Sequence, residues 1–152
     1  MSHYSERNHP MSQISVAEFQ ALIDSELPLV KLFGMHTEDI ANGTARLRMH
    51  FNPDLIRPGG TIAGPALMAL ADATLYAVVL GMIGKVELAV TTSLNINFLR
   101  KPPQEDVIAE GRILKLGKRL AVGEVLLYST GSDEPVAHVT GTYSIPPLPD
   151  NR

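Results

Sequence analysis

One carboxylate, that of Asp72, stands alone in a long apolar stretch of the sequence. No other charged side chain occurs within residues 61–84. An ionised carboxylate in apolar surroundings is costly unless it is paired or hydrogen-bonded. Asp72 is therefore either a structural acid or the nucleophile or general base of a reaction. The structural alternative would pair it with Arg57, Thr74 or Tyr76.

The apolar stretch predicts one helix, over about residues 65–80. Pro65 suits the first turn of a helix, where a backbone N–H has no helical partner, and Gly81 and Gly84 favour an end. The stretch is long enough to raise the question of a membrane span. Glycine and proline interrupt its beginning, however, and alternating segments follow. We therefore predict a helix buried inside the protein and no membrane partner.

The remaining sequence predicts a short helix and six strands around this helix. Ser15 and Glu18 form a capping-box pattern at the start of the short helix, and Asn42-Gly43 predicts a hairpin turn. The predicted strands cover residues 36–40, 44–50, 89–99, 106–115, 120–129 and 135–144. Turn residues between the last four favour an antiparallel meander. The expected fold class is α+β, a curved antiparallel sheet wrapped around one long central helix.

The composition bears on the number of domains, the partners and the location of the protein. A chain of 152 residues, nearly half of them apolar, fits a single domain, expected over residues 14–146 between tails at 1–13 and 147–152. With a net charge of -3 it has no basic stripe, so we predict no nucleic-acid partner. The absence of cysteine and of a signal segment favours a cytoplasmic location. No histidine pair has metal-ligand spacing, so we predict no metal.

Three segments carry a pattern in the same order and spacing as a known family. They are Gly-Thr-Ile-Ala-Gly-Pro at 60–65 with Leu-Ala-Asp at 70–72, Val-Thr-Thr-Ser-Leu-Asn-Ile-Asn-Phe-Leu at 90–99, and Leu-Gly-Lys-Arg-Leu-Ala at 116–121. Over about residues 29–146 the chain resembles the hot-dog-fold thioesterases of the PaaI-like acyl-CoA thioesterase family. Ala63 stands where that family has a histidine, and Arg57 where it has an asparagine.

The resemblance implies hydrolysis of a small or aromatic acyl-CoA to the free acid and coenzyme A, with no cofactor beyond the coenzyme A of the substrate. It implies that the Gly64 backbone N–H polarises the thioester carbonyl. Asp72 would be the nucleophile or general base, and Thr91, in the place of a family serine, would position the water. The positive end of a helix dipole at Gly64 would stabilise the oxygen that becomes negative during attack.

Other residues are expected to contact the substrate. These are Arg57, Ala63, Ser93, Tyr76, Lys118 and Arg119. We expect Ser93 to share a strand face with Thr91, two residues away, and Lys118 and Arg119 to contact the phosphates of coenzyme A.

The predicted sheet is too small to cover such an apolar helix alone. The exposed remainder favours pairing with a second copy, as a homodimer or a dimer-of-dimers tetramer, in which Asp72 faces the loop of the other subunit.

Two other functions remain open at this point. Ala63 and Arg57 are compatible with a non-catalytic protein that binds acyl-CoA without turnover. His50-Phe51 followed by Pro58-Gly59 resembles a segment of the hot-dog hydroxyacyl dehydratases, and such an activity would depend on His50.

Overall fold

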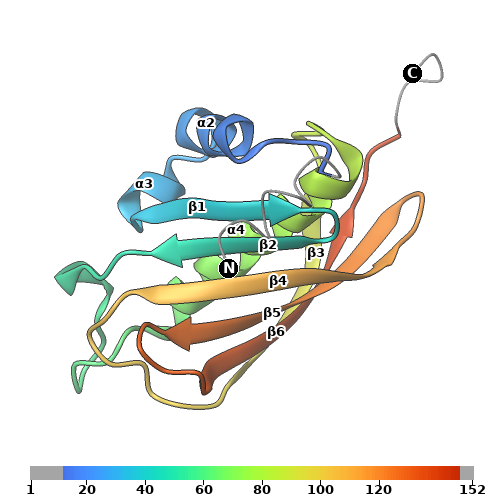
Figure 1. The fold of residues 1–152 in the computed structure, drawn as a ribbon. Helices are drawn as coiled ribbons and strands as arrows, with labels where there is room; N and C mark the ends of the chain where they lie inside the picture. Colours follow the sequence, from blue (N-terminus) through green and yellow to red (C-terminus); the bar gives the residue numbers. More distant parts are fainter. Residues whose placement is uncertain (1–11, 148–152) are drawn as a thin grey trace.

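One long helix packed against the inner face of a six-stranded antiparallel sheet makes up the core of the protein. The computed structural model describes residues 12–147, so the predicted tails lie almost wholly outside this range. The long helix, α4, spans Gly64–Ile83 and lies behind the strands in Figure 1. The predicted hot-dog architecture is confirmed: a curved antiparallel sheet wraps around one central helix.

The six strands agree with the sequence prediction to within one residue at each end, whereas two short helices, at residues 29–32 and 53–55, were not predicted. The strands are β1 (Met35–Ala41), β2 (Thr44–Met49), β3 (Val90–Phe98), β4 (Val107–Leu116), β5 (Leu120–Ser129) and β6 (Pro135–Ser144). The helices besides α4 are α2 (Val16–Glu26), α3 (Leu29–Leu32) and the short 3-10 helix η2 (Pro53–Leu55). Ser15 caps α2 through the predicted capping box with Glu18. Figure 1 shows α2 and α3 beside β1, so they cover that edge of the sheet.

The order of the strands differs from a simple meander. It is β1-β2-β4-β5-β6-β3, with every neighbouring pair antiparallel. The last three strands follow one another as predicted, but β3 pairs with β6 at the far edge and not with β4. The helix explains this order. In the chain, α4 lies between β2 and β3. Because α4 packs across the sheet, β3 begins at the edge opposite to β1.

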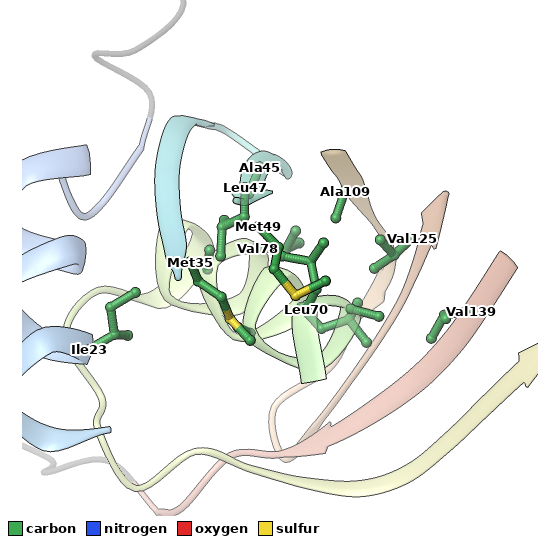
Figure 2. Close-up of a cluster of buried hydrophobic side chains, with 14 of the residues drawn as sticks. Ile23, Met35, Ala45, Leu47, Met49, Leu70, Val78, Ala109, Val125 and Val139 are labelled. Carbon is green, nitrogen blue, oxygen red and sulfur yellow. The ribbon is translucent and has the colours of Figure 1, made fainter. Parts of the chain in front are cut away.

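Alternating strand residues and the helix build the core. Ala45, Leu47 and Met49 of β2 are buried on one face, as the alternation predicts. Figure 2 shows these side chains with those of the other strands gathered around α4, among them Ala109, Val125 and Val139. The helix has the length and hydropathy of a membrane span, but 67% of its most apolar window is buried inside the protein. This burial identifies α4 as the core helix of the sheet.

Glycines in the sheet set how closely α4 approaches it. Gly123 and Gly141 pair directly across β5 and β6, and Leu75 lies over both. A Cβ atom at Gly141 would lie 2.6 Å from Leu75 Cδ1, and one at Gly123 would lie 2.8 Å from Leu75 Cδ2. Larger residues at these two positions would push the helix away. Leu75 follows Asp72 by less than one turn, so the same packing fixes the height of Asp72 above the sheet.

The end of α4 corrects one boundary of the prediction. The helix continues to Ile83. Gly81 does not end it but allows close packing against β1. A Cβ atom at Gly81 would lie 2.8 Å from Ile40 Cγ2 on β1. The cap is Gly84, whose φ of 89° lies in the region that favours glycine.

Candidate functional site

An open groove between α4 and β3 contains Asp72. Four helix residues at the spacing of one helical face, together with two residues of β3, line a volume of about 340 Å³: Pro65, Met68, Ala69, Asp72, Thr91 and Leu94. Asp72 is the one charged side chain among them, and the walls on either side are mainly apolar. The sheet leaves this stripe of α4 uncovered, which is why the groove exists.

Two hydroxyl groups hold the Asp72 carboxylate, and both reach the same oxygen. Thr91 Oγ1 donates to Asp72 Oδ1 at 2.5 Å, and the Tyr143 phenol donates to Oδ1 at 2.8 Å. Within residues 12–147, no donor bonds to Oδ2, and Oδ2 is not among the buried polar atoms that lack a partner. Oδ2 is therefore the carboxylate oxygen open to the groove.

The structural alternative for Asp72 named three partners, and none of them bonds to it in the described part of the chain. Thr74 donates to the Leu70 carbonyl, and Tyr76 donates to the Glu87 carbonyl. Arg57 donates to the Pro58 carbonyl near the start of α4. The hydrogen bonds that do hold Asp72 come from β3 and β6.

Tyr143 is a site residue that the sequence interpretation missed. It lies on β6, directly opposite Thr91 of β3, and its side chain is 4% exposed. Burial, and after it the negative charge of Asp72, raises the pKa of the Tyr143 phenol far above its ordinary value. The phenol thus stays protonated and acts as a donor. Alternation along residues 135–144 could have identified it, because Ala137, Val139 and Tyr143 share the buried face.

Ser93 does not share the strand face of Thr91, and this prediction was wrong. The pairing of β3 with β6 is irregular between the two residues: Thr91 pairs with Tyr143, but Ser93 already pairs with Thr142. This β-bulge shifts the alternation by one residue. Because directly paired residues point to the same face and successive residues to opposite faces, Ser93 points away from Asp72. Leu94 takes its place in the groove.

The beginning of α4 carries a free backbone donor at Gly64. Within the described residues no acceptor bonds to the Gly64 N–H, whereas the Ala66 N–H already bonds to the Ala63 carbonyl at 3.1 Å. Pro65, between them, has no N–H. Ala63 is the N-cap and offers no side-chain cap. Gly64 is accordingly the donor left to stabilise a negative oxygen at this end of the helix.

Gly64 lies in a second pocket, separate from the Asp72 groove. Its volume is about 260 Å³ and its lining residues are Arg57, Thr61, Ile62, Gly64, Leu67, Phe98, Arg100, Lys101 and Pro102. The loop before α4 is fixed by backbone bonds, since the Arg57 N–H donates to the Thr61 carbonyl and the Ile62 N–H to the Pro102 carbonyl. Arg57 and Gly64 thus line the same pocket.

The Asp72 groove and the Gly64 pocket are called the two half-sites below. They are too far apart to act on one bond within a single chain. Gly64 and Asp72 are separated by eight residues of continuous α4. At the rise of an α-helix, their backbones lie about 12 Å apart along the axis. A thioester carbonyl bonded to the Gly64 N–H could not reach Asp72 of the same copy.

The remaining predicted residues lie outside both half-sites. Tyr76 stacks on Tyr143 with ring centroids 6.1 Å apart, but it does not line the Asp72 groove. Lys118 and Arg119 are exposed on the turn between β4 and β5. His50, the residue of the dehydratase alternative, lies 3.2 Å from Asp106 through Nδ1 and lines neither half-site.

No cluster of three or more His, Asp or Glu side chains that could hold a metal occurs within residues 12–147. The two half-sites offer a carboxylate with one free oxygen, two hydroxyls and a free backbone N–H. Such a set can activate a water or attack a carbonyl directly, and it can stabilise the oxygen that becomes negative.

Comparison with known proteins identifies relatives across most of the chain. The family model of the thioesterase superfamily matches residues 59–136, which include Gly64, Asp72 and Thr91 but not Tyr143. A protein of Saccharolobus solfataricus named as a candidate esterase is 32% identical over 133 residues, covering 87% of this chain and 86% of the relative.

Solved structures agree with this result. A candidate thioesterase from Silicibacter sp. TM1040 is 39% identical, with a TM-score of 0.82, and the match covers 90% of this chain and 94% of that one. A mutant of the phenylacetic acid degradation protein PaaI from Thermus thermophilus is 26% identical, with a TM-score of 0.69, covering 78% of this chain and 98% of that one.

Proposed function

The chain belongs to the thioesterase superfamily, and we propose that it hydrolyses a small or aromatic acyl-CoA to the free acid and coenzyme A. The observation that carries the proposal is the state of Asp72. It is the lone acid of an apolar groove, held through Oδ1, with Oδ2 open to the groove. A carboxylate held in this way is suited to react at its second oxygen.

Asp72 Oδ2 acts in one of two ways. As a general base it takes a proton from a water, whose oxygen attacks the thioester carbonyl; as a nucleophile it attacks the carbonyl itself, and water then cleaves the resulting anhydride. In both cases the carbon–sulfur bond breaks and the thiolate of coenzyme A leaves. Thr91, whose proton is used on Oδ1, can accept a hydrogen bond from the water and so position it.

The Gly64 N–H stabilises the carbonyl oxygen as it becomes negative. It is the free donor at the start of α4, where the helix dipole adds a favourable potential. In measured enzymes the loss of one such donor reduces kcat about 10²- to 10³-fold. Arg57, in the same pocket, adds a positive charge close to this oxygen.

The separation of the half-sites supports an active site shared between two copies of the chain. The Gly64 N–H of one copy and Asp72 of the other would meet on one thioester, at two equivalent sites in a homodimer. The edge strand β3 supports this arrangement. It pairs only with β6 among the described strands, and Val90 and Phe98 on it are 58% and 54% exposed. A long edge strand that exposes apolar side chains is normally paired or covered.

The nature of the acyl group is proposed from the groove and from a relative. Met68, Ala69 and Leu94 form apolar walls, which suit a small alkyl or aromatic group. The relative from Thermus thermophilus is named for phenylacetic acid degradation. Lys118 and Arg119 would contact the phosphates at the other end of coenzyme A.

The substitution Asp72→Asn tests the proposal, because it keeps the shape of the side chain and removes the base. We expect kcat on a panel of short, aromatic and long acyl-CoA thioesters to fall at least about 10²-fold, as measured by thiol release. Asp133→Asn, on an exposed loop, is the matched control and should leave kcat unchanged. Full activity of Asp72→Asn on every thioester that the native protein hydrolyses would refute the role of Asp72.

A second candidate function, binding of acyl-CoA without turnover, is favoured by Ala63, since the N-cap of α4 has no side-chain group to offer. Thiol release and calorimetric binding on the same panel separate the two functions. Binding without release for every thioester would support this alternative, and release from one class at enzymatic rates would exclude it.

A further inference from the structure

The two hydrogen bonds to Asp72 are unevenly distributed over its carboxylate. Both hydroxyl donors bond to Oδ1, from Thr91 at 2.5 Å and from Tyr143 at 2.8 Å, and within residues 12–147 none bonds to Oδ2. Hydrogen bonds to a charged oxygen are roughly twice as strong as neutral ones. The two oxygens of Asp72 therefore differ, and Oδ1 is the one that is stabilised in place.

Tyr143 has a further contact that fixes the direction of its phenol. The hydroxyl oxygen lies 2.9 Å from the backbone carbonyl of Asp72 and 2.8 Å from Oδ1 of the same residue. A phenol has a single proton to donate, and the charged carboxylate is the stronger acceptor. Tyr143 thus contacts both the backbone and the side chain of Asp72, which restricts the rotation of the carboxylate.

The surroundings of Tyr143 hold its side chain in a fixed position. It pairs directly with Thr91 across β3 and β6, is 4% exposed, and stacks on Tyr76 of α4. The hydroxyl of a buried side chain on a paired strand is already in place before the reaction begins. Electrostatic preorganisation requires donors that are fixed in advance in this way.

We infer that Tyr143 is a positioning residue that, with Thr91, holds Asp72 through Oδ1 and so assigns the reaction to Oδ2. The inference rests on the proposed function, since it names the atom of Asp72 that takes the proton or attacks the carbonyl. Tyr143 lies outside the groove and outside the span matched by the family model, and it acts only through Asp72.

The variant Tyr143→Phe tests the inference, because it removes the donor and keeps the ring that fills the core. The ionised carboxylate loses a hydrogen bond, so its charged form becomes less favourable. We expect kcat to fall about 10- to 100-fold with KM unchanged. The acid side of the pH profile of kcat/KM should move to higher pH.

Tyr128→Phe is the matched control. It removes a phenol hydroxyl from β5 that makes no contact with Asp72, and it should leave the pH profile of the native protein unchanged. Thermal unfolding of both variants checks that the fold is retained. Thr91→Val provides a second variant with the same expected direction, because Thr91 donates to the same oxygen.

A double-mutant cycle shows whether Tyr143 acts through Asp72. In the Asp72→Asn background, Tyr143→Phe should cause no further loss of the residual activity, whereas a separate structural role would cost the same in both backgrounds. The ¹³C chemical shift of the Asp72 carboxyl carbon, followed with pH, supplies a readout that needs no activity. Its half-point should rise in Tyr143→Phe and not in Tyr128→Phe.

The outcomes separate this inference from the proposed function. If Asp72→Asn is inactive but Tyr143→Phe moves neither the pH profile nor the ¹³C half-point, the inference is wrong and the proposed function stands. If no thioester is hydrolysed, the proposed function fails. The ¹³C titration then still decides whether Tyr143 stabilises the charged form of Asp72.

Discussion

In the proposed mechanism, Asp72 and Gly64 divide the chemistry of the site between a side chain and a backbone group. The carboxylate depends on two hydroxyl donors from neighbouring strands, whereas the N–H depends only on its place at the start of α4. The two groups can therefore be tested by different kinds of substitution. A change of side chain removes the acid, but only proline removes the backbone donor.

Gly64→Pro should lower kcat about 10²- to 10³-fold, because it removes the N–H that we propose stabilises the carbonyl oxygen. Proline is tolerated in the first turn of a helix. Gly64→Ala is the matched control, since it keeps the N–H. Its Cβ would lie 3.0 Å from Phe98 Cζ, the tip of an exposed ring that can shift. Thiol release measures both, and equal losses in the two variants would show that crowding, and not the donor, is responsible.

The sequence identified part of the site residue by residue. Asp72 was evident because it is the one charged residue within residues 61–84, whereas only the structure shows that Gly64 and Arg57 share a pocket. Ser93 was misplaced because a bulge in β3 reverses the alternation after Thr91, and single-sequence patterns carry no mark of a bulge. Tyr143 is 71 residues from Asp72. Its contact depends on β3 pairing with β6, which local patterns do not reveal.

The packing of α4 against the sheet determines the position of Asp72. Leu75 occupies the space left by two paired glycines of β5 and β6. The hydroxyl of Tyr143 comes from the same strand as Gly141, two residues further on. Packing of the helix and hydrogen bonding of the acid are therefore coupled through β6.

Gly141→Ala should destabilise the protein by about 1–3 kcal/mol, because the new methyl group would lie 2.6 Å from Leu75 Cδ1. Chemical unfolding measures the change. Thr140→Ala, at the neighbouring position on the opposite face of β6, is the control and should cost less. Adding Leu75→Ala to Gly141→Ala should cost less than the sum of the two single changes; strict additivity would argue against the contact.

Asp106 links the start of β4 to the end of β2 through hydrogen bonds of its carboxylate. Its carboxylate accepts from the Phe51 N–H at 2.7 Å and from Arg48 at 3.1 Å, and it lies 3.2 Å from His50 Nδ1. Burial acts to raise the pKa of Asp106, but the bonds from Phe51, Arg48 and His50 outweigh it and hold the pKa below its ordinary value. The ionised carboxylate thus stabilises the folded state.

Asp106→Asn should lower the free energy of unfolding by about 1 kcal/mol at neutral pH. A lowered folded pKa contributes stability that is complete above the unfolded value, about 3.9, and is lost as the pH falls through the folded value. The difference between native and variant should therefore shrink below about pH 4. Urea unfolding at several pH values measures it, with the exposed neighbour Glu105→Gln as control. A difference that stays constant with pH would contradict this assignment.

The elements themselves were largely predictable because their signals are local. The capping box of Ser15, the Asn42-Gly43 turn and the alternation of β5 and β6 each depend on a few adjacent residues. The end of α4 was placed too early because Gly81 looks like a helix end in sequence, whereas it makes room for Ile40. The place of β3 beside β6 follows from how α4 crosses the sheet, which is a property of the packed molecule.

In the proposed mechanism, a single copy of the protein would leave the active site incomplete. The Asp72 groove and the Gly64 pocket are separate, and their key groups lie about 12 Å apart along one helix. The uncovered edge of β3 and the uncovered stripe of α4 lie on the same side of the site, because residues of both line the groove. A second copy placed there would cover them and complete two equivalent sites.

Mixing of two inactive variants tests whether the active site is shared between two copies of the chain. An equimolar mixture of Asp72→Asn and Gly64→Pro chains, unfolded and refolded together, forms mixed dimers in which one of the two sites has an intact Gly64 N–H and an intact Asp72. Because about half of the dimers are mixed, thiol release should recover to about a quarter of the native rate. Mixed dimers, verified by native mass spectrometry, that stay as inactive as the separate variants would contradict the shared site.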